Sequence, residues 1–350
     1  MKGSYKKYIL NFKSPSGTSR GTLVTKETWF LLLEEKGEYG IGECGLFRGL
    51  SYDDVPDYEE KLKWTVDNIN TDTDILYHGL KHYPSILFGL EQALLSLKSK
   101  NPYELFNTSF LKKESPIPIN GLVWMGDENF MHKQIQDKLA DGFTCIKMKI
   151  GAIDFQKEFN LLKSIRKSYS REEIELRVDA NGAFKPENAP DKLKRLAALD
   201  LHSIEQPIKP GNLLEMKKLC EQTPLPIALD EELIGVLDIT EKEELLETIR
   251  PQYIILKPSL VGGFRGSQEW IILAEKYNIS WWITSALESN IGLNAIAQWC
   301  ATLNNPMPQG LGTGELFTNN FESPLTVKNG ALYYDSTKNW DENLINEICI

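Results

Sequence analysis

The sequence predicts an α/β protein in which a closed parallel barrel of alternating strands and helices follows an N-terminal α+β unit. Short apolar strands recur with one helical segment between them, and each strand ends in a charged residue. Asp179, Glu205, Asp230 and Lys257 follow one another at intervals of 26, 25 and 27 residues, which is one strand, one helix and two loops each time. Because the C-terminal ends of all strands in such a barrel lie on one face, these charged side chains are expected to lie close together on that face.

A pair of lysines occupies the preceding strand, and Lys149 comes 30 residues before Asp179. Lys147 and Lys149 lie two residues apart in the strand Cys145–Ile150, so their side chains point to the same side, about 7 Å apart. The other side of this strand is apolar, as expected of a barrel strand that packs outward against helices. The alternative is an exposed strand face that carries both lysines. Lys257, in an apolar strand before a proline, fits a surface position less well.

Length and composition limit the class of protein. A chain of 350 residues holds two domains or one large barrel with additions, and 41% hydrophobic and 25% charged residues are ordinary for a globular protein. The net charge of −10 argues against a nucleic-acid partner, and no apolar run is long enough to span a membrane. No signal peptide is recognised, and five scattered cysteines without a CxxC pair indicate neither a zinc site nor a disulfide framework. We therefore expect a protein of the reducing cytoplasm, either a monomer or a homo-oligomer.

Taken in order, the chain divides into three parts: an N-terminal α+β unit in residues 1–114, the barrel in residues 115–324, and a C-terminal segment in residues 325–350. The first part is expected to contain strands in residues 1–35 and 39–44 and helices in residues 54–70 and 85–98. The last part is expected to return to the N-terminal unit through a strand at Ala331–Tyr334.

The barrel is expected to open with a strand at Ile117–Trp124 and to include another at Trp281–Ser285, with a glycine-rich segment at Gly310–Gly314 near its end. Apolar periodicity places helices between the strands, at residues 130–140, 155–168, 190–199, 213–220, 240–248 and 267–277.

Two glycine-containing loops stand out in the N-terminal unit, Ser14–Gly21 and Gly45–Ser51. Loops of this composition are usually simple turns. A second interpretation is that they form a lid over the face where the strand-end charges meet.

The three carboxylates of Asp179, Glu205 and Asp230 would repel one another on adjacent strand ends unless a cation lay between them. Oxygen ligands of this kind suit a hard divalent ion, Mg²⁺ or Mn²⁺. The alternative is that each carboxylate caps a strand or forms an ion pair separately. A lysine facing a metal-bound substrate carboxylate indicates proton abstraction from the carbon α to that carboxylate, with the metal stabilising the resulting charge.

Five motifs carry a resemblance to a known family: Lys147-Met148-Lys149, Asp179-Ala180-Asn181, Glu205-Gln206-Pro207, Asp230-Glu231 and Leu256-Lys257-Pro258. In these motifs the chain resembles the muconate-lactonizing subgroup of the enolase superfamily. The resemblance covers nearly the whole chain and implies a modified TIM barrel, (β/α)7β, with an N-terminal α+β capping domain. It implies that Asp179, Glu205 and Asp230 bind Mg²⁺, that Lys149 and Lys257 flank the substrate, and that Asn181 and Glu231 support them.

Within that subgroup, Thr284–Leu293 and Gly310–Gly314 look like the seventh-strand region of the o-succinylbenzoate synthase family. Dipeptide epimerases of the subgroup carry Asp-x-Asp at this strand to hold a substrate ammonium, whereas this chain has Thr284-Ser285-Ala286 there. The chain departs from the pattern at Gly182, where some synthases have arginine. It also departs in the Gly45–Ser51 loop, which lacks a Pro-Leu-Pro-Gly pattern.

The resemblance therefore implies a dehydratase that acts on a small carboxylate, the succinyl hydroxycyclohexadiene carboxylate. Lys149 is expected to move the proton and Lys257 to stay charged, with Lys147 beside them. Ser285 and the backbone at Gly310 and Gly312 are expected to receive the succinyl carboxylate. The alternatives are an N-succinylamino acid racemase, dipeptide epimerase or muconate cycloisomerase, a class I aldolase using Lys257, and a metal-dependent binding protein without catalysis.

Overall fold

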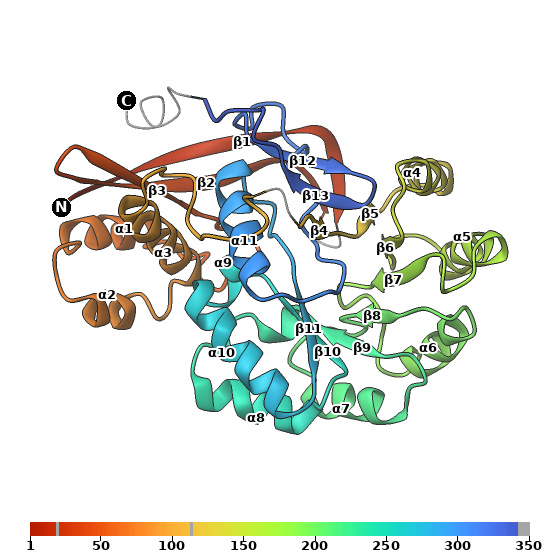
Figure 1. Cartoon of the computed structure of the whole chain (residues 1–350). Helices are drawn as coiled ribbons and strands as arrows, with labels where there is room; N and C mark the ends of the chain where they lie inside the picture. Colours follow the sequence, from red (N-terminus) through yellow and green to blue (C-terminus); the bar gives the residue numbers. More distant parts are fainter. Residues whose placement is uncertain (19–20, 113–114, 342–350) are drawn as a thin grey trace.

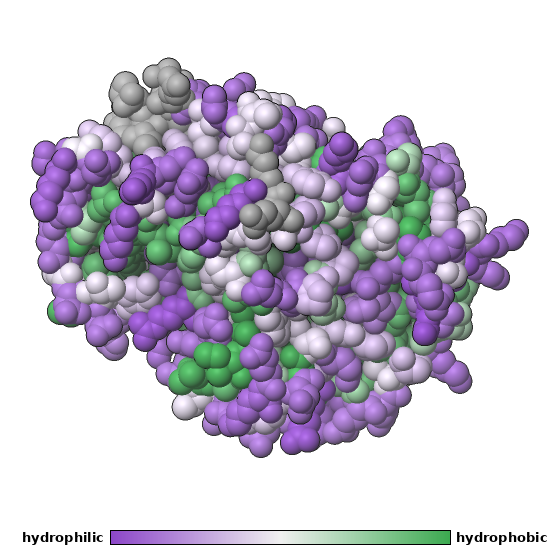
Figure 2. All heavy atoms as spheres, in the orientation of Figure 1, coloured by the Kyte–Doolittle hydropathy of each residue, from purple (hydrophilic) through white to green (hydrophobic). Residues whose placement is uncertain are grey.

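The structure, a computed structural model, describes residues 1–18, 21–112 and 115–341. Figure 1 shows an antiparallel N-terminal sheet with its helices on one side of the molecule, and a ring of parallel strands surrounded by helices on the other. On the face drawn in Figure 2, hydrophilic side chains cover most of the surface and apolar ones gather in a few places. Within the described residues, no helix is long and apolar enough to cross a membrane.

The N-terminal sheet has the order β1-β2-β3, and three helices pack beside it. Its elements are β1 (Lys2–Thr18), β2 (Gly21–Glu35), β3 (Glu38–Cys44), α1 (Tyr58–Asp67), α2 (Thr73–Gly79) and α3 (Pro84–Lys98). Helix α3 can lie close to β3 because Gly40 and Gly42 have no side chains. A Cβ added at Gly42 would lie 1.9 Å from the carbonyl oxygen of Gly89 in α3.

Seven parallel strands form the barrel in the order β11-β10-β9-β8-β7-β6-β5, so each strand lies beside its neighbour in sequence. They are β5 (Gly121–Val123), β6 (Cys145–Lys149), β7 (Glu175–Asp179), β8 (Ser203–Glu205), β9 (Ile227–Leu229), β10 (Tyr253–Leu256) and β11 (Ser280–Ile283).

A short segment closes the ring between β11 and the residues that lead into β5. The amide of Gly310 donates to Ile283 O at 2.8 Å on one side, and the amide of Gln309 donates to Pro118 O at 2.8 Å on the other. This segment takes the place of an eighth strand, so the barrel is the modified (β/α)7β form that the sequence predicts.

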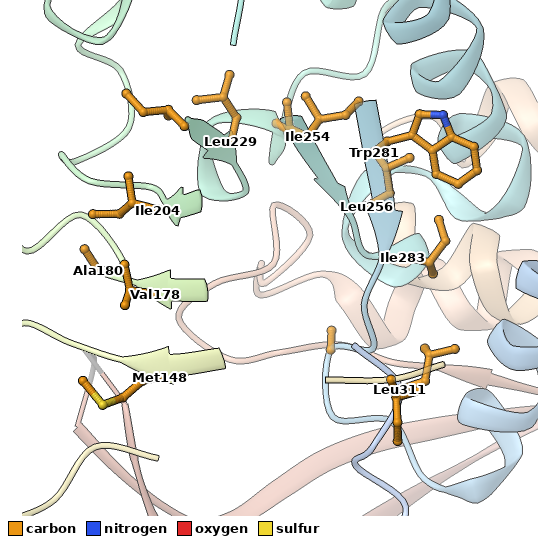
Figure 3. Packing of buried hydrophobic residues seen from close by; sticks show 14 of the residues in the cluster. Met148, Val178, Ala180, Ile204, Leu229, Ile254, Leu256, Trp281, Ile283 and Leu311 are labelled. Atoms are coloured by element: carbon orange, nitrogen blue, oxygen red, sulfur yellow. The ribbon is translucent and has the colours of Figure 1, made fainter. Parts of the chain in front are cut away.

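Helices follow the barrel strands and cover the outside of the ring. They are α4 (Glu128–Ala140), α5 (Phe155–Ser168), α6 (Ala189–Ala197), α7 (Leu213–Gln222), α8 (Ile239–Ile249), α9 (Pro258–Val261), α10 (Gly263–Lys276) and α11 (Asn290–Thr302), with a 3-10 turn η1 (Glu231–Leu233) after β9. The strand side chains that face these helices form the main core, and Figure 3 shows Met148, Val178, Ile204, Leu229 and Ile283 around the ring.

The prediction of a single strand at Ile117–Trp124 is wrong. The chain instead forms β4 (Ile117–Pro118), leaves that sheet, and enters the barrel at β5. Strand β4 pairs with β13 (Ala331–Tyr334), which is the predicted C-terminal strand, and β13 pairs in turn with β12 (Leu325–Lys328). This small third sheet was not expected, because pairing between segments more than two hundred residues apart leaves no local pattern.

Helices α2, α9 and α11 were also not predicted. Helix α11 is buried on nearly all sides, so its sequence has no polar stripe that would reveal helical periodicity. The tail contacts the N-terminal sheet through Trp340, which packs in one apolar cluster with Phe30 and Leu32. The predicted boundary at Glu114 lies outside the described residues, and the division into domains stays a prediction.

Four cysteines of the described chain, Cys44, Cys145, Cys220 and Cys300, are buried and free, and Cys349 lies outside the described residues.

A buried carboxylate joins the N-terminal unit to the barrel on one side. Helix α10 begins after Gly262, which has no side chain to cap it, and Glu91 of α3 serves instead. Glu91 accepts hydrogen bonds from the amides of Phe264 (2.5 Å) and Arg265 (3.2 Å) and from the Tyr77 hydroxyl (3.1 Å). Burial raises the pKa of Glu91 to about 7, although these hydrogen bonds oppose the change.

We expect Glu91 to make the stability of the protein depend on pH. The folded chain keeps a proton on Glu91 up to about pH 7, whereas an unperturbed glutamate releases it near pH 4.5. The tighter binding of this proton by the folded state stabilises the protein at low pH, and this contribution is lost as the pH rises from about 4.5 to about 7. The free energy of unfolding of the wild type relative to Glu91→Gln should fall by on the order of 2–3 kcal/mol across it. Urea denaturation at several pH values measures the free energy of unfolding of both proteins. The same dependence of this free energy on pH in the wild type and in Glu91→Gln would contradict the prediction.

Candidate functional site

The predicted strand-end residues are brought together by the register of the barrel. Lys149 of β6 lies directly opposite Asp179 of β7, and Asp179 lies directly opposite Glu205 of β8. Asp230 and Lys257 are the residues that follow β9 and β10. Five adjacent strands therefore deliver their charges to one end of the ring.

A cavity of about 100 Å³ lies at this end. Most of the predicted site residues line it, namely Lys147, Lys149, Asp179, Asn181, Glu231, Lys257, Ser285, Gly310 and Gly312. The two that do not are Glu205 and Asp230, which are buried at the strand ends.

The lysines form ion pairs with the carboxylates. Lys147 bridges two of them, since its Nζ lies 3.3 Å from Asp179 Oδ2 and also contacts Glu205. Lys149 Nζ lies 3.1 Å from Asp179 Oδ2, and Lys257 contacts Asp230. All three lysines line the cavity, two from β6 and one from the end of β10.

These pairings set the acidities of the groups. Burial alone would raise the pKa of Asp179, but the positive charges of Lys147 and Lys149 outweigh it and hold that pKa well below its usual range. The pKa of Glu205 is raised well above its usual range by burial and by the negative charge of Asp179. The pKa of Lys257 is raised because attraction to Asp230 outweighs the effect of burial. Asp179 is therefore held in its charged form, whereas the charged form of Glu205 is disfavoured.

As they stand, the carboxylates do not surround a common point closely enough to hold a metal, and no such group of ligands is found within the described residues. Lysine side chains lie between them. The chemistry of the donors nevertheless fits a hard divalent cation, because three carboxylates end adjacent strands and buried Glu205 Oε1 has no hydrogen-bond partner. The assignment of Asp179, Glu205 and Asp230 as ligands stays a prediction.

Asn181 and Glu231 are placed beside the lysines by a chain of hydrogen bonds. Lys149 Nζ donates to Asn181 Oδ1 at 2.8 Å, and Asn181 Nδ2 donates to Glu231 Oε1 at 2.9 Å. Asn181 has a φ of 41°, a left-handed conformation that asparagine tolerates better than most residues. The Asn181 amide also donates to Asp179 Oδ1 at 3.0 Å, which ties this turn to the strand end.

Ser285, Gly310 and Gly312 line the cavity at the place where the closing segment meets the end of β11. Ser285 Oγ lies 2.7 Å from Thr313 Oγ1, and the Ser285 amide donates to Gly310 O at 3.1 Å. A Cβ at Gly310 would lie 2.4 Å from Thr284 Oγ1, so only glycine allows the closing segment to approach β11.

The apolar part of the cavity was largely missed from the sequence. Its residues come from three separate places: Phe47 and Leu50 of the capping loop, Leu122 and Trp124 at β5, and Leu287 after β11. The Gly45–Ser51 loop therefore forms part of the cavity wall, and its role as a lid stays a prediction. The Ser14–Gly21 segment is the end of the β1–β2 hairpin, and residues 19–20 of it lie outside the described residues.

Gln206 is another residue whose role was missed from the sequence. Its side chain is fully buried, and its Oε1 accepts hydrogen bonds from the amides of Asp230 and Glu232, both at 3.2 Å. Gln206 Nε2 donates to Glu232 Oε2 at 2.9 Å. Gln206 thus fixes the turn after β9 that carries Asp230. Its place in the Glu205-Gln206-Pro207 motif was the available signal.

Comparison with known proteins gives a consistent result. A family model described as enolase C-terminal domain-like matches residues 131–337. The o-succinylbenzoate synthase of Desulfotalea psychrophila is 48% identical, and the match covers 95% of this chain and 98% of the relative.

Solved structures agree with the sequence match. The crystal structure of MenC from Desulfotalea psychrophila has a TM-score of 0.85 at 44% identity, covering 95% of this chain and 99% of the other. A dipeptide epimerase from Enterococcus faecalis, complexed with Mg and a dipeptide, has a TM-score of 0.80 at 20% identity, covering 95% and 96%. At that identity the second likeness shows the fold alone.

Proposed function

The chain belongs to the enolase superfamily and, within it, to the o-succinylbenzoate synthase family, and on that premise we propose how its site dehydrates a succinyl hydroxycyclohexadiene carboxylate to o-succinylbenzoate. This is a lyase reaction of menaquinone biosynthesis. The observation that carries the proposal is the placement of Lys149 and Lys257 around one small cavity with an apolar wall.

In this proposal Lys149 accepts the proton from the carbon α to the ring carboxylate. The same ammonium then donates the proton to the departing hydroxide, so proton removal and loss of water occur on one face of the ring. Asn181 supports this role, because it holds the Lys149 amine in place and is itself held by Glu231.

Lys257 and Lys147 have a different role, since they remain charged. The raised pKa of Lys257, which follows from its attraction to Asp230 despite burial, keeps its ammonium protonated. From its side of the cavity that charge stabilises the negative charge that develops during proton removal, and it favours the aromatic product through cation–π attraction. Lys147 is similarly kept charged, because Asp179 and Glu205 outweigh the effect of its burial on its pKa.

Members of this superfamily use a divalent metal, and we propose that Asp179, Glu205 and Asp230 hold Mg²⁺ in this chain, with Mn²⁺ as a substitute. When bound, the ion supplies positive charge that stabilises the substrate carboxylate as it gains electron density.

The remaining contacts position the substrate. Trp124, Leu122 and the capping-loop residues Phe47 and Leu50 offer apolar surface to the ring, and this surface excludes water. In this proposal Ser285 and the backbone at Gly310 and Gly312, which line the cavity, receive the succinyl carboxylate. No free carboxylate lines the cavity between Thr284 and Ala286, so a substrate ammonium would have no partner there.

A direct assay tests this function. Purified protein with Mg²⁺ should convert the cyclohexadiene substrate to an aromatic product, followed by ultraviolet absorbance, and a chelator should remove the activity reversibly. Lys149→Ala should lower kcat by about 10²–10⁴-fold, the usual contribution of a proton-transferring side chain. Lys157→Ala, on an exposed part of helix α5, is the matched control and should retain wild-type activity.

Three results would count against the proposal. They are full activity in excess chelator, substantial activity of Lys149→Ala, and ligand binding by the wild type without turnover. The last would favour a binding protein, and borohydride trapping of substrate on Lys257 would favour an aldolase.

Specificity provides a separate prediction. Because the cavity offers no carboxylate to a substrate ammonium near Ser285, kcat/KM for dipeptide epimerisation should be at least about a hundredfold below that for dehydration, or about 2.7 kcal/mol in transition-state stabilisation. Proton exchange at the dipeptide α-carbon in deuterium oxide, followed by NMR, gives the comparison. Efficient epimerisation with little dehydration would overturn the assignment.

A further inference from the structure

A buried polar cluster joins the capping unit to the cavity wall and has no part in the reaction described above. Its charged members are Lys26 of β2, Glu43 of β3 and Glu288 of the loop between β11 and α11, and all three side chains are buried. Two come from the N-terminal sheet and one from the barrel, so the cluster lies at the contact between the two parts.

Glu288 anchors the loop that forms part of the cavity. Its Oε2 accepts a hydrogen bond from the amide of Ala286 at 2.6 Å, and its Oε1 accepts one from Ser259 Oγ at 2.6 Å. Ala286 lines the cavity, and Ser259 follows Lys257 by two residues. Glu288 therefore connects the loop after β11 to the segment that carries Lys257.

Leu287, which lies between Ala286 and Glu288 in the sequence, has a strained backbone conformation. Leu287 has a φ of 62°, a left-handed conformation that leucine rarely adopts. Its side chain lines the cavity and packs in one apolar cluster with Leu10 and Phe12 of β1. Such a conformation persists only where surrounding contacts hold it, and the hydrogen bond between Ala286 and Glu288 spans Leu287.

Glu43 holds the other side of the same loop. It accepts hydrogen bonds from Ser289 Oγ (2.5 Å), from the Ser289 amide (3.0 Å) and from the Gly292 amide (3.0 Å). A carboxylate from the N-terminal sheet thus caps helix α11 of the barrel.

Lys26 supplies the positive charge of the cluster. Its Nζ is buried without a hydrogen-bond partner, and burial lowers the pKa of Lys26 while Glu288 and Glu43 oppose that change. Two buried carboxylates in one cluster would otherwise repel each other.

We propose that Glu288 is a positioning residue for substrate, and that with Lys26 and Glu43 it allows the capping unit to set the shape of the cavity wall at Ala286 and Leu287. The inference rests on the proposed function. It assigns part of the substrate specificity to a cluster whose members do not line the cavity.

The test compares KM with kcat for the cyclohexadiene substrate. Glu288→Ala removes the hydrogen bonds to Ala286 and Ser259. It should raise KM at least about tenfold while kcat stays within about threefold of wild type, because the variant binds the substrate less well but keeps the groups that move the proton. Glu288→Gln keeps an acceptor for the Ala286 amide and a partner for Ser259, so its KM should stay within about 1.5-fold of wild type. If Glu288→Ala does not fold, Ser259→Ala removes one anchor and should raise KM about threefold.

The charge of the cluster is tested through Lys26. Lys26→Met leaves two buried carboxylates uncompensated and should raise KM, and adding Glu288→Gln to it should bring KM back toward wild type. If the KM of the double variant is no lower than that of Lys26→Met, charge compensation by Lys26 does not affect substrate binding.

Glu91→Ala is the matched control, since Glu91 is also a buried carboxylate that caps a barrel helix from the N-terminal unit and does not line the cavity. It should lower the melting temperature without changing KM. An unchanged KM in Glu288→Ala would overturn the inference, and so would a rise in KM in Glu91→Ala equal to that in Glu288→Ala. Neither result would affect the proposed function as long as the wild type turns over the substrate. Absence of wild-type turnover would overturn the proposed function and the inference with it.

Discussion

Mutual compensation of buried charges at the ends of five adjacent strands is the constraint on which the rest of this structure depends. Parallel register places Lys149, Asp179 and Glu205 side by side, and the next two strands add Asp230 and Lys257. Burying one such charge without a partner costs several kcal/mol. The ion pairs of Lys147, Lys149 and Lys257 offset that cost, and they also place amines and carboxylates where a substrate would be held.

The N-terminal unit completes the site in two ways. Its Gly45–Ser51 loop adds apolar surface over the charged end of the barrel, where water would otherwise weaken every electrostatic interaction. Its carboxylates also cap barrel helices, Glu91 at α10 and Glu43 at α11. The two parts therefore share buried polar groups as well as apolar contacts, and separating them would leave helix ends unsatisfied.

The barrel and the charged residues were predictable because they depend on local patterns. A strand that ends in a charge, repeated at an interval of one strand and one helix, is visible without any knowledge of contacts. The apolar wall was not predictable in this way, since Phe47, Trp124 and Leu287 are separated by long stretches of chain. The same holds for the split of Ile117–Trp124 between two sheets, which depends on pairing with β13. Glu288 has no sequence signal that separates it from a surface glutamate.

The central claim is that Asp179, Glu205 and Asp230 act together as ligands of one divalent ion. Titration of the protein with Mn²⁺, followed by electron paramagnetic resonance, tests this claim most directly. We expect one bound ion per chain in the wild type, and much weaker binding in each of Asp179→Asn, Glu205→Gln and Asp230→Asn. Glu175→Gln, at the opposite end of strand β7 from Asp179, should bind as the wild type does. Unchanged affinity in all three ligand variants would contradict the account.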